Sequence, residues 1–217
     1  ANLKNIDITV EEKATGEVLV GAGVGSDGGT AQFSVSENNF LGKGIKLSTG
    51  LRISEERLRG NFTVTNPNFN YSDKSLSTDI FITDTDKLTD YGYKSTNAGF
   101  SFGTSFEQYD DFFFRPTFRT SYEELSTNSS ASANLKKQEG SYFDTTFDYT
   151  LTFDKRNSAY QPSAGFFSSW VQQLPVISEN QTIINGYSIT GYKEVADDMI
   201  VSSGIYSRAV NSLTNDD

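Results

Sequence analysis

Carboxylates are the side chains in this sequence most suited to acid–base catalysis or metal binding, because the chain contains neither histidine nor cysteine. Adjacent acids occur at Asp110-Asp111, Asp197-Asp198 and Asp216-Asp217. A calcium loop needs oxygen ligands at alternate positions followed by a glycine, and no such pattern is present. Acids that are neighbours in a loop are usually only solvated. We therefore expect no metal site and no catalytic carboxylate pair.

Other classes of function are excluded by what the sequence lacks. Without histidine and cysteine, the chain offers no thiolate or imidazole metal ligand and no Cys–His nucleophile pair. It also lacks the Gly-x-Ser-x-Gly turn that presents a nucleophilic serine. A net charge of -10 argues against nucleic acid as a partner, because phosphate binding needs clustered lysine and arginine. We expect a protein that is not an enzyme, uses no cofactor and binds no nucleic acid.

The elements that position these residues follow one plan, which is clearest in a strand that ends at a proline. Apolar or small residues alternate with polar residues from Leu58 to Thr65, as expected for a strand with two unlike faces. Proline cannot donate to a β-ladder and restricts the residue before it. Asn66-Pro67 therefore predicts a turn at the end of this strand.

The same plan repeats along the chain and predicts an all-β fold, an antiparallel up-and-down meander. Pro116 should weaken the ladder of its strand locally. A Ser-, Asn- and Lys-rich loop is expected at 125–141. The expected strands lie near residues 17–25, 31–36, 45–54, 58–65, 76–82, 97–106, 112–122, 143–153, 165–176, 182–195 and 199–211.

Strand length and aromatic content favour a membrane barrel over a sandwich or a soluble barrel. Many of the expected strands exceed the five or six residues that are usual in globular sheets. Tight turns near 39–44, 66–73, 108–111 and 177–181 should form one rim, and the long polar loop should lie on the other. Trp170 and the tyrosines near strand ends suit an aromatic girdle, although in a sandwich they would be core residues. No run of apolar residues is long enough for a transmembrane helix.

Four short motifs follow one another along the chain: Asn39–Gly44, Thr65–Phe69, Asp154–Arg156 and Gln161–Gly165. In this order and spacing they resemble BamA-type outer-membrane assembly factors. The resemblance covers nearly the whole chain and implies about eleven of the sixteen strands of a transmembrane β-barrel, over residues 16–217. The family's Arg-Gly-Phe loop motif and last strands would lie beyond Asp217, so we expect a fragment that cannot close a barrel by itself. The structural motif residues that the resemblance implies are Asn66, Pro67, Phe69, Asp154, Arg156, Pro162 and Gly165.

Residues 1–15 differ from the rest of the chain. Ile6, Ile8 and Val10 alternate with polar residues, and Lys13 to Gly16 has the composition of a linker. The stretch resembles the last strand of a periplasmic POTRA domain. The resemblance thus implies a periplasmic segment at 1–15 and a barrel in the outer membrane of a Gram-negative-type bacterium.

The function that the resemblance implies is the folding and insertion of other β-barrel proteins, with unfolded outer-membrane proteins, accessory assembly lipoproteins and outer-membrane lipids as partners. The first barrel strand would act as a lateral gate that pairs with a client strand. The glycines in this strand add backbone freedom and little packing, so it should pair weakly and open easily. An open strand edge is a template for another strand. The residues expected to pair with the client are Val18, Leu19, Val20, Gly21, Ala22, Gly23, Val24 and Gly25.

Several alternatives stay open at this point. A porin-like channel would use the polar faces of the strands as a pore lining. A partner-secretion translocator of the same superfamily and a soluble lectin-like β protein are further interpretations. Asp154 and Arg156 form either an inward ion pair or a solvated pair in a turn, and exposed pairs contribute little to stability.

Overall fold

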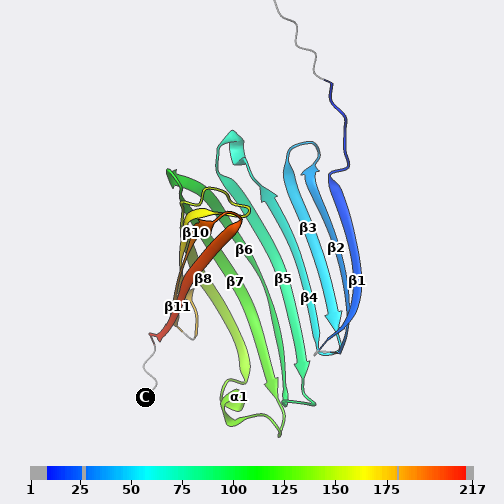
Figure 1. The fold of residues 1–217 in the computed structure, drawn as a ribbon. Helices are drawn as coiled ribbons and strands as arrows, with labels where there is room; N and C mark the ends of the chain where they lie inside the picture. The colour runs from blue at the N-terminus through cyan, green and yellow to red at the C-terminus, as the bar shows by residue number, and fades with distance from the viewer. Residues whose placement is uncertain (1–8, 26–27, 180, 214–217) are drawn as a thin grey trace, which may run out of the picture.

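The computed structural model describes residues 9–25, 28–179 and 181–213. These residues form one antiparallel sheet in which each strand pairs with the strands before and after it in the sequence. Figure 1 shows this sheet curled into an open trough, with β1 and β11 at its two edges. The predicted all-β up-and-down meander with 11 strands is therefore confirmed.

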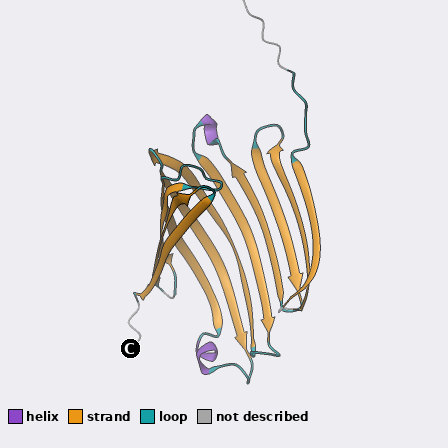
Figure 2. Cartoon of the chain, viewed as in Figure 1, coloured by secondary structure: helices purple, strands orange, loops and turns teal. Residues whose placement is uncertain are grey.

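The strands are long, from 10 residues in β1 to 17 in β6. Figure 2 shows how little of the chain is helical. Among the described residues, no helix is long and apolar enough to cross a membrane. The elements are β1 Gly16–Gly25, β2 Gly28–Phe40, β3 Ile45–Ser54, β4 Arg57–Asn66, the 3-10 helix η1 Phe69–Tyr71, β5 Ser75–Lys87, β6 Tyr93–Tyr109, β7 Phe112–Thr127, α1 Ala133–Lys137, β8 Gly140–Asp154, β9 Ala164–Ile177, β10 Thr182–Ala196 and β11 Met199–Ser212.

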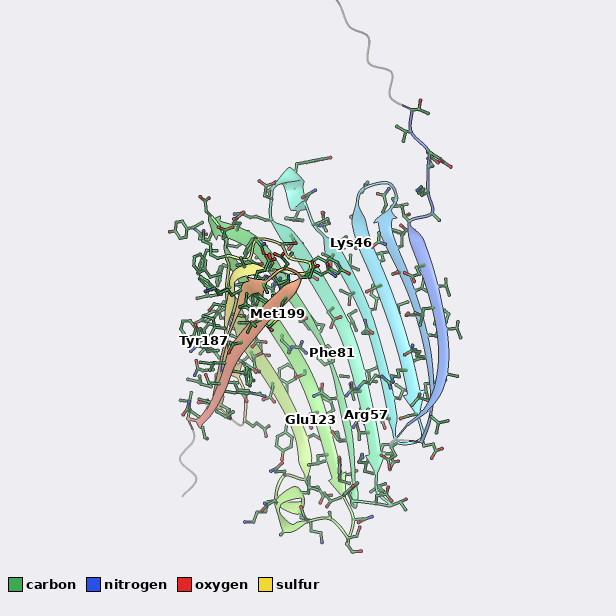
Figure 3. The ribbon with its side chains drawn as sticks, viewed as in Figure 1. Lys46, Arg57, Phe81, Glu123, Tyr187 and Met199 are labelled. Atoms are coloured by element: carbon green, nitrogen blue, oxygen red, sulfur yellow. The ribbon has the colours of Figure 1, made fainter. Side chains whose placement is uncertain are left out.

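The two faces of the sheet differ in polarity, as the alternation predicts. Directly paired residues share a face, so Ile80 lies on the same face as Phe62 and Phe100. This convex face carries large apolar side chains that are exposed, including Ile80 at 55%. Asp79 lies on the opposite, concave face, where hydroxyl, amide and charged groups predominate. Figure 3 shows Arg57, Phe81 and Glu123 on the concave side and Tyr187 on the outer side.

A packed core is not what holds this sheet together. Leu125 and Ala131 are the only apolar residues that are buried within the described part of the chain. Trp170 is 40% exposed on the convex face, where its ring meets Tyr149 edge-on at 6.0 Å. A single sheet with an exposed apolar face does not fit a sandwich, in which that face would be covered by a second sheet.

Two details of the expected turns are wrong. The loop 125–141 is shorter than predicted, because β7 continues to Thr127 and β8 begins at Gly140, and it contains the short helix α1. The turn near 177–181 lies on the rim of this long loop and not with the other tight turns. Three strands, β7, β8 and β9, lie between it and the turn at 110–111, and an odd number of strands places a turn on the opposite rim.

The proline in β7 has the predicted local effect. Pro116 pairs with Tyr149 of β8, but the pairing of β7 with β6 is interrupted between Thr117 and Phe114. The same β6–β7 register resumes beyond the gap. The pairing of β7 with β8 continues through Pro116, because the missing N–H donor affects one side of the strand only.

The segment before β1 has no regular structure where it is described. Residues 9–15 form no strand, and Val10 is 80% exposed. Ile6 and Ile8 lie outside the described residues, so the POTRA strand at 1–15 stays a prediction. Because the linker enters β1, the turns 41–44, 67–74, 110–111, 155–163 and 197–198 lie on the same rim as the linker, which we call the linker-side rim.

Candidate functional site

The strand β1 has a single partner in the described part of the chain. It pairs with β2 from Gly16 opposite Glu37 to Gly25 opposite Gly28, and its other edge pairs with no described strand. Val24 is 91% exposed and Val20 76% exposed. The N–H and C=O groups along such an edge form a row that another strand can pair with. The residues predicted to pair with a client, Val18 to Gly25, all lie on this strand.

The glycines of β1 are not required by tight packing. A Cβ atom on Gly25 would meet nothing within 4 Å, and one on Gly23 would meet only Thr30 Oγ1, at 3.7 Å. Gly21 is tighter, because a Cβ there would lie 3.0 Å from Nε2 of Gln32. A larger residue would fit at Gly23 and Gly25, and at Gly23 it would contact Thr30 of β2. Their effect is therefore to keep the strand loosely packed and conformationally free.

The two ends of β1 are held differently. At the linker end, both the backbone N–H and the side-chain amide of Asn38 donate to Thr15 C=O, each at 3.1 Å. At the other end, the Thr30 hydroxyl donates to Gly23 C=O at 3.3 Å, a longer bond beside two glycines. The ladder runs unbroken between these contacts, from Gly16 opposite Glu37 to Gly25 opposite Gly28, and only residues 26–27 join the two strands at the Gly25 end.

The sheet has a second free edge at β11. Every residue of this strand is exposed, and β10 is its single described partner. β11 differs from β1 in composition, because Gly204 is its only glycine. A Cβ on Gly204 would come within 2.9 Å of Thr190 Oγ1, so this glycine is required by close approach to β10.

Asp154 and Arg156 form a forked ion pair on the linker-side rim. Arg156 Nε donates to Asp154 Oδ1 at 2.8 Å, and Nη2 donates to Oδ2 at 2.7 Å. Phe167 pairs with Asp154 on the concave face, and the guanidinium lies 4.7 Å from its ring centroid. The hydrogen bond to Asp154 raises the pKa of Arg156. The inward ion pair is therefore the alternative that the structure favours over a solvated pair in a turn.

The loop after this pair is held by Asn157 and Gly165. Asn157 Oδ1 accepts from the N–H groups of Ser163 and Ala164 at 3.0 and 3.1 Å. Gly165 has a φ of +91°, and a Cβ there would collide with Lys155 C=O. Only glycine tolerates both conditions. Pro162, which lies between Asn157 and Gly165 in the sequence, is half-buried. The Gln161–Gly165 motif therefore shapes a loop.

The Asn66-Pro67 motif also acts as a turn. Asn66 ends β4, and its Oδ1 accepts from Asn68 N–H at 3.1 Å, as in an Asx turn. Phe69 begins η1, and its N–H donates to Lys74 C=O at 2.8 Å. The Phe69 side chain is 48% exposed. The structure brings the motif residues to one rim, but it does not bring them to the free edge of β1.

The predicted acid pairs lie in turns or outside the described residues. Asp111 accepts from Lys155 Nζ at 2.5 Å, and this hydrogen bond raises the pKa of Lys155. Asp198 lies in the turn after β10, and Asp216-Asp217 lies outside the described residues. No group of three or more acidic side chains in the described ranges is arranged to hold a metal ion.

Two contacts at the rim were not expected from the sequence. The hydrogen bonds from Asn38 to Thr15 join the end of β2 to the linker, and the Lys155–Asp111 pair joins two successive turns of the linker-side rim. If the sequence had shown that Gly16 pairs with Glu37 in a hairpin, Asn38 would have been expected beside Thr15. The Lys155–Asp111 contact requires the register of two further strands.

Comparisons with known proteins match the fold just described. A family model for the Omp85 superfamily domain matches residues 39–212. A crystal structure of BamA from Haemophilus ducreyi lacking POTRA domains 1–3 is similar, with a TM-score of 0.77 and 21% sequence identity. The similarity covers 94% of this chain and 42% of that one, so the chain spans less than half the length of that protein. The chain therefore belongs to the Omp85 superfamily and forms part of the barrel of an outer-membrane protein of the Gram-negative type.

Proposed function

We propose that this chain is the N-terminal part of the barrel of a factor that folds and inserts β-barrel proteins into the outer membrane. The observation that carries the proposal is the free, exposed and glycine-containing edge of β1. Backbone groups pair with any strand of matching register, so one edge can serve clients of many sequences. The step needs strand exchange and no catalytic group.

The expected arrangement follows from the linker, which enters β1 from one rim of the sheet. The linker-side rim faces the periplasm, where unfolded clients and accessory lipoproteins arrive, and the convex face contacts lipid. β1 stays paired with β2 and keeps the contact between Asn38 and Thr15. A client strand then pairs with the exposed edge from Val18 to Gly25.

The test places single cysteines at positions 18–25 of the full-length protein. Each is tested for crosslinking to a cysteine in the last strand of a stalled client. We expect crosslinks in one register, with alternate positions reacting most strongly, and their loss when Ala22→Pro removes a donor from β1. Cysteines at matched positions of β5, which pairs on both sides, are the control and should not react.

A porin-like channel is the second candidate, because the concave face is polar. Hydroxyl groups of Ser77, Ser101 and Thr117 line a hollow of about 340 Å³ together with Arg115. Such a surface suits the wall of a water-filled lumen. If no β1 cysteine crosslinks to a client while the protein conducts ions steadily in planar bilayers, the channel function replaces assembly.

A further inference from the structure

Three arginines lie together on the concave face, beside the turn between β3 and β4. Arg52 lies near the end of β3, and Arg57 and Arg59 lie at the beginning of β4. With Thr30 and Ser54 they line a hollow of about 110 Å³. Figure 3 shows Arg57 on the concave side of the sheet. We call these three residues the arginine cluster.

No acidic side chain within the described residues forms an ion pair with the cluster, although the neighbouring Glu56 carboxylate feels the charge of Arg57. Arg52 and Arg59 face each other directly across the ladder, and like charges in that position destabilise a sheet. The ion pairs of the described chain involve Lys87, Lys94, Lys155 and Arg156, and none reaches the cluster. Arg57 Nε is buried there without a hydrogen-bond partner.

The acids closest to the cluster in sequence are engaged elsewhere. Glu55 Oε1 accepts from Gly29 N–H at 3.4 Å. Glu56 Oε2 lies 2.9 Å from Lys87 Nζ. Three arginines thus lie together without an ion pair, in a chain whose net charge is -10. An anionic ligand would remove both the repulsion and the unmet hydrogen-bonding capacity.

We propose that the arginine cluster binds the carboxylates of an acidic, extended polypeptide segment on the concave side of the sheet. Guanidinium groups bind carboxylates through two parallel hydrogen bonds. Arg57 and Arg59 lie two residues apart on one face, a spacing of roughly 6.6 Å in a strand. An extended segment with acids at alternate positions presents carboxylates at the same repeat. The site does not depend on strand pairing at β1.

Binding is tested with the full-length protein and a fluorescein-labelled peptide of alternating Asp and Ser, followed by fluorescence anisotropy. The combined variant Arg52→Gln, Arg57→Gln, Arg59→Gln should bind at least about 10-fold more weakly, because charge-assisted pairs are lost. Arg115→Gln is the matched control, since Arg115 is exposed on the same face outside the cluster. It should change affinity less than about twofold, as expected for a distant exposed charge.

Equal affinity of the wild type and the triple variant would overturn the proposal. Inorganic phosphate that displaces the peptide at equal concentration would assign the site to a small free anion instead, which also overturns it. Asp27 lies outside the described residues, so the variant Asp27→Asn is measured as well. Tighter peptide binding by this variant would show that Asp27 is the anionic partner of the cluster, which also overturns the proposal. The thermal midpoint of the triple variant should not fall, because repulsion is removed. A fall would show that the arginines serve the β3–β4 hairpin itself.

Discussion

At the scale of single residues, the linker-side rim depends on one guanidinium. Arg156 makes two hydrogen bonds to Asp154, lies over Phe167, and donates through Nη1 to Ala159 C=O at 3.4 Å. Its side chain is 19% exposed, so solvent screens the pair less than it would on an open surface. A lysine at this position keeps the charge but has neither the planar fork nor the stacking.

We therefore predict that Arg156→Lys lowers the free energy of unfolding by about 1.5–3 kcal/mol, the range for hydrogen bonds to charged groups. Urea titration of the full-length barrel in vesicles measures the change. Arg115→Lys is the control, because Arg115 forms no ion pair with described residues, and it should leave the midpoint unchanged. An equal shift in both variants would mean that the fork contributes nothing specific.

A second residue-scale prediction concerns the backbone at Gly165. Its φ of +91° is unfavourable for any residue with a Cβ, and that Cβ would meet Lys155 C=O. Gly165→Ala should cost more than about 2 kcal/mol, because strain and overlap act together. The fraction that runs as folded barrel on a semi-native gel should drop. Gly191→Ala is the control, since a Cβ at Gly191 would meet nothing within 4 Å, and normal folding of Gly165→Ala would contradict the prediction.

At the scale of elements, an ion pair joins the β3–β4 turn to the end of β5. Hydrogen bonding to Lys87 lowers the pKa of Glu56 below its ordinary value of 4.5. A carboxylate with a lowered folded-state pKa adds stability above the unfolded pKa, and that stability is lost as the pH falls through the folded pKa. The contribution should thus be complete near neutral pH and vanish below about pH 4, close to the ordinary range for glutamate.

The measurement compares unfolding midpoints of the wild type and Glu56→Gln between pH 7 and pH 3. The difference should be present at pH 7 and shrink as the pH falls below 4.5, the ordinary pKa of Glu56. Glu55→Gln is a control for net charge, because Glu55 belongs to the same turn but forms no ion pair with described residues. A difference that persists unchanged at pH 3 would sink this assignment.

The first strand supplies the next prediction at this scale. A Cβ fits at both Gly23 and Gly25, and β-branched residues favour strands. The double variant Gly23→Val, Gly25→Val should stabilise the pairing of β1 with β2 by about 1 kcal/mol. If strand pairing at β1 drives client insertion, the same variant should insert clients into vesicles more slowly. Gly186→Val in β10 is the control, and unchanged insertion by the β1 variant would remove the proposed role of its glycines.

The alternation of apolar and polar residues predicts most of this architecture, because each strand has two unlike environments. The faces of β4 and the turn at Asn66-Pro67 are examples. The helix α1 was not predicted, although the sequence carries a signal for it, the N-cap Ser132 whose Oγ accepts from Leu135 N–H at 3.3 Å. The arginine cluster leaves a signal in the sequence, because a two-residue turn at 55–56 places Arg52 opposite Arg59. The cluster was missed because single arginines on a polar strand face are common. Only the pairing register of β3 and β4 shows that these arginines are adjacent.

At the scale of the whole molecule, two opposite surfaces share one sheet. The convex face exposes Ile80, Phe100 and Phe62, whereas the concave face bears Asp79 and Thr83 on the same strand as Ile80. In water, an exposed apolar surface of this extent would be a liability for aggregation. In a bilayer it is the favoured surface, because lipid tails replace the missing core. The fold is therefore consistent only with a nonpolar solvent on its convex side.

This argument predicts a strong asymmetry between neighbouring positions of β5. Ile80 lies near the middle of the strand, so Ile80→Arg should place a charge near the bilayer centre and cost about 2–4 kcal/mol. Thr83→Arg, on the concave side, should cost less than about 1 kcal/mol, because lumen substitutions keep the charge hydrated. Urea titration of the full-length protein in phospholipid vesicles measures both. The asymmetry should disappear in short-chain detergent, where the apolar layer is thin and deformable, and equal costs in vesicles would mean that the convex face does not contact lipid.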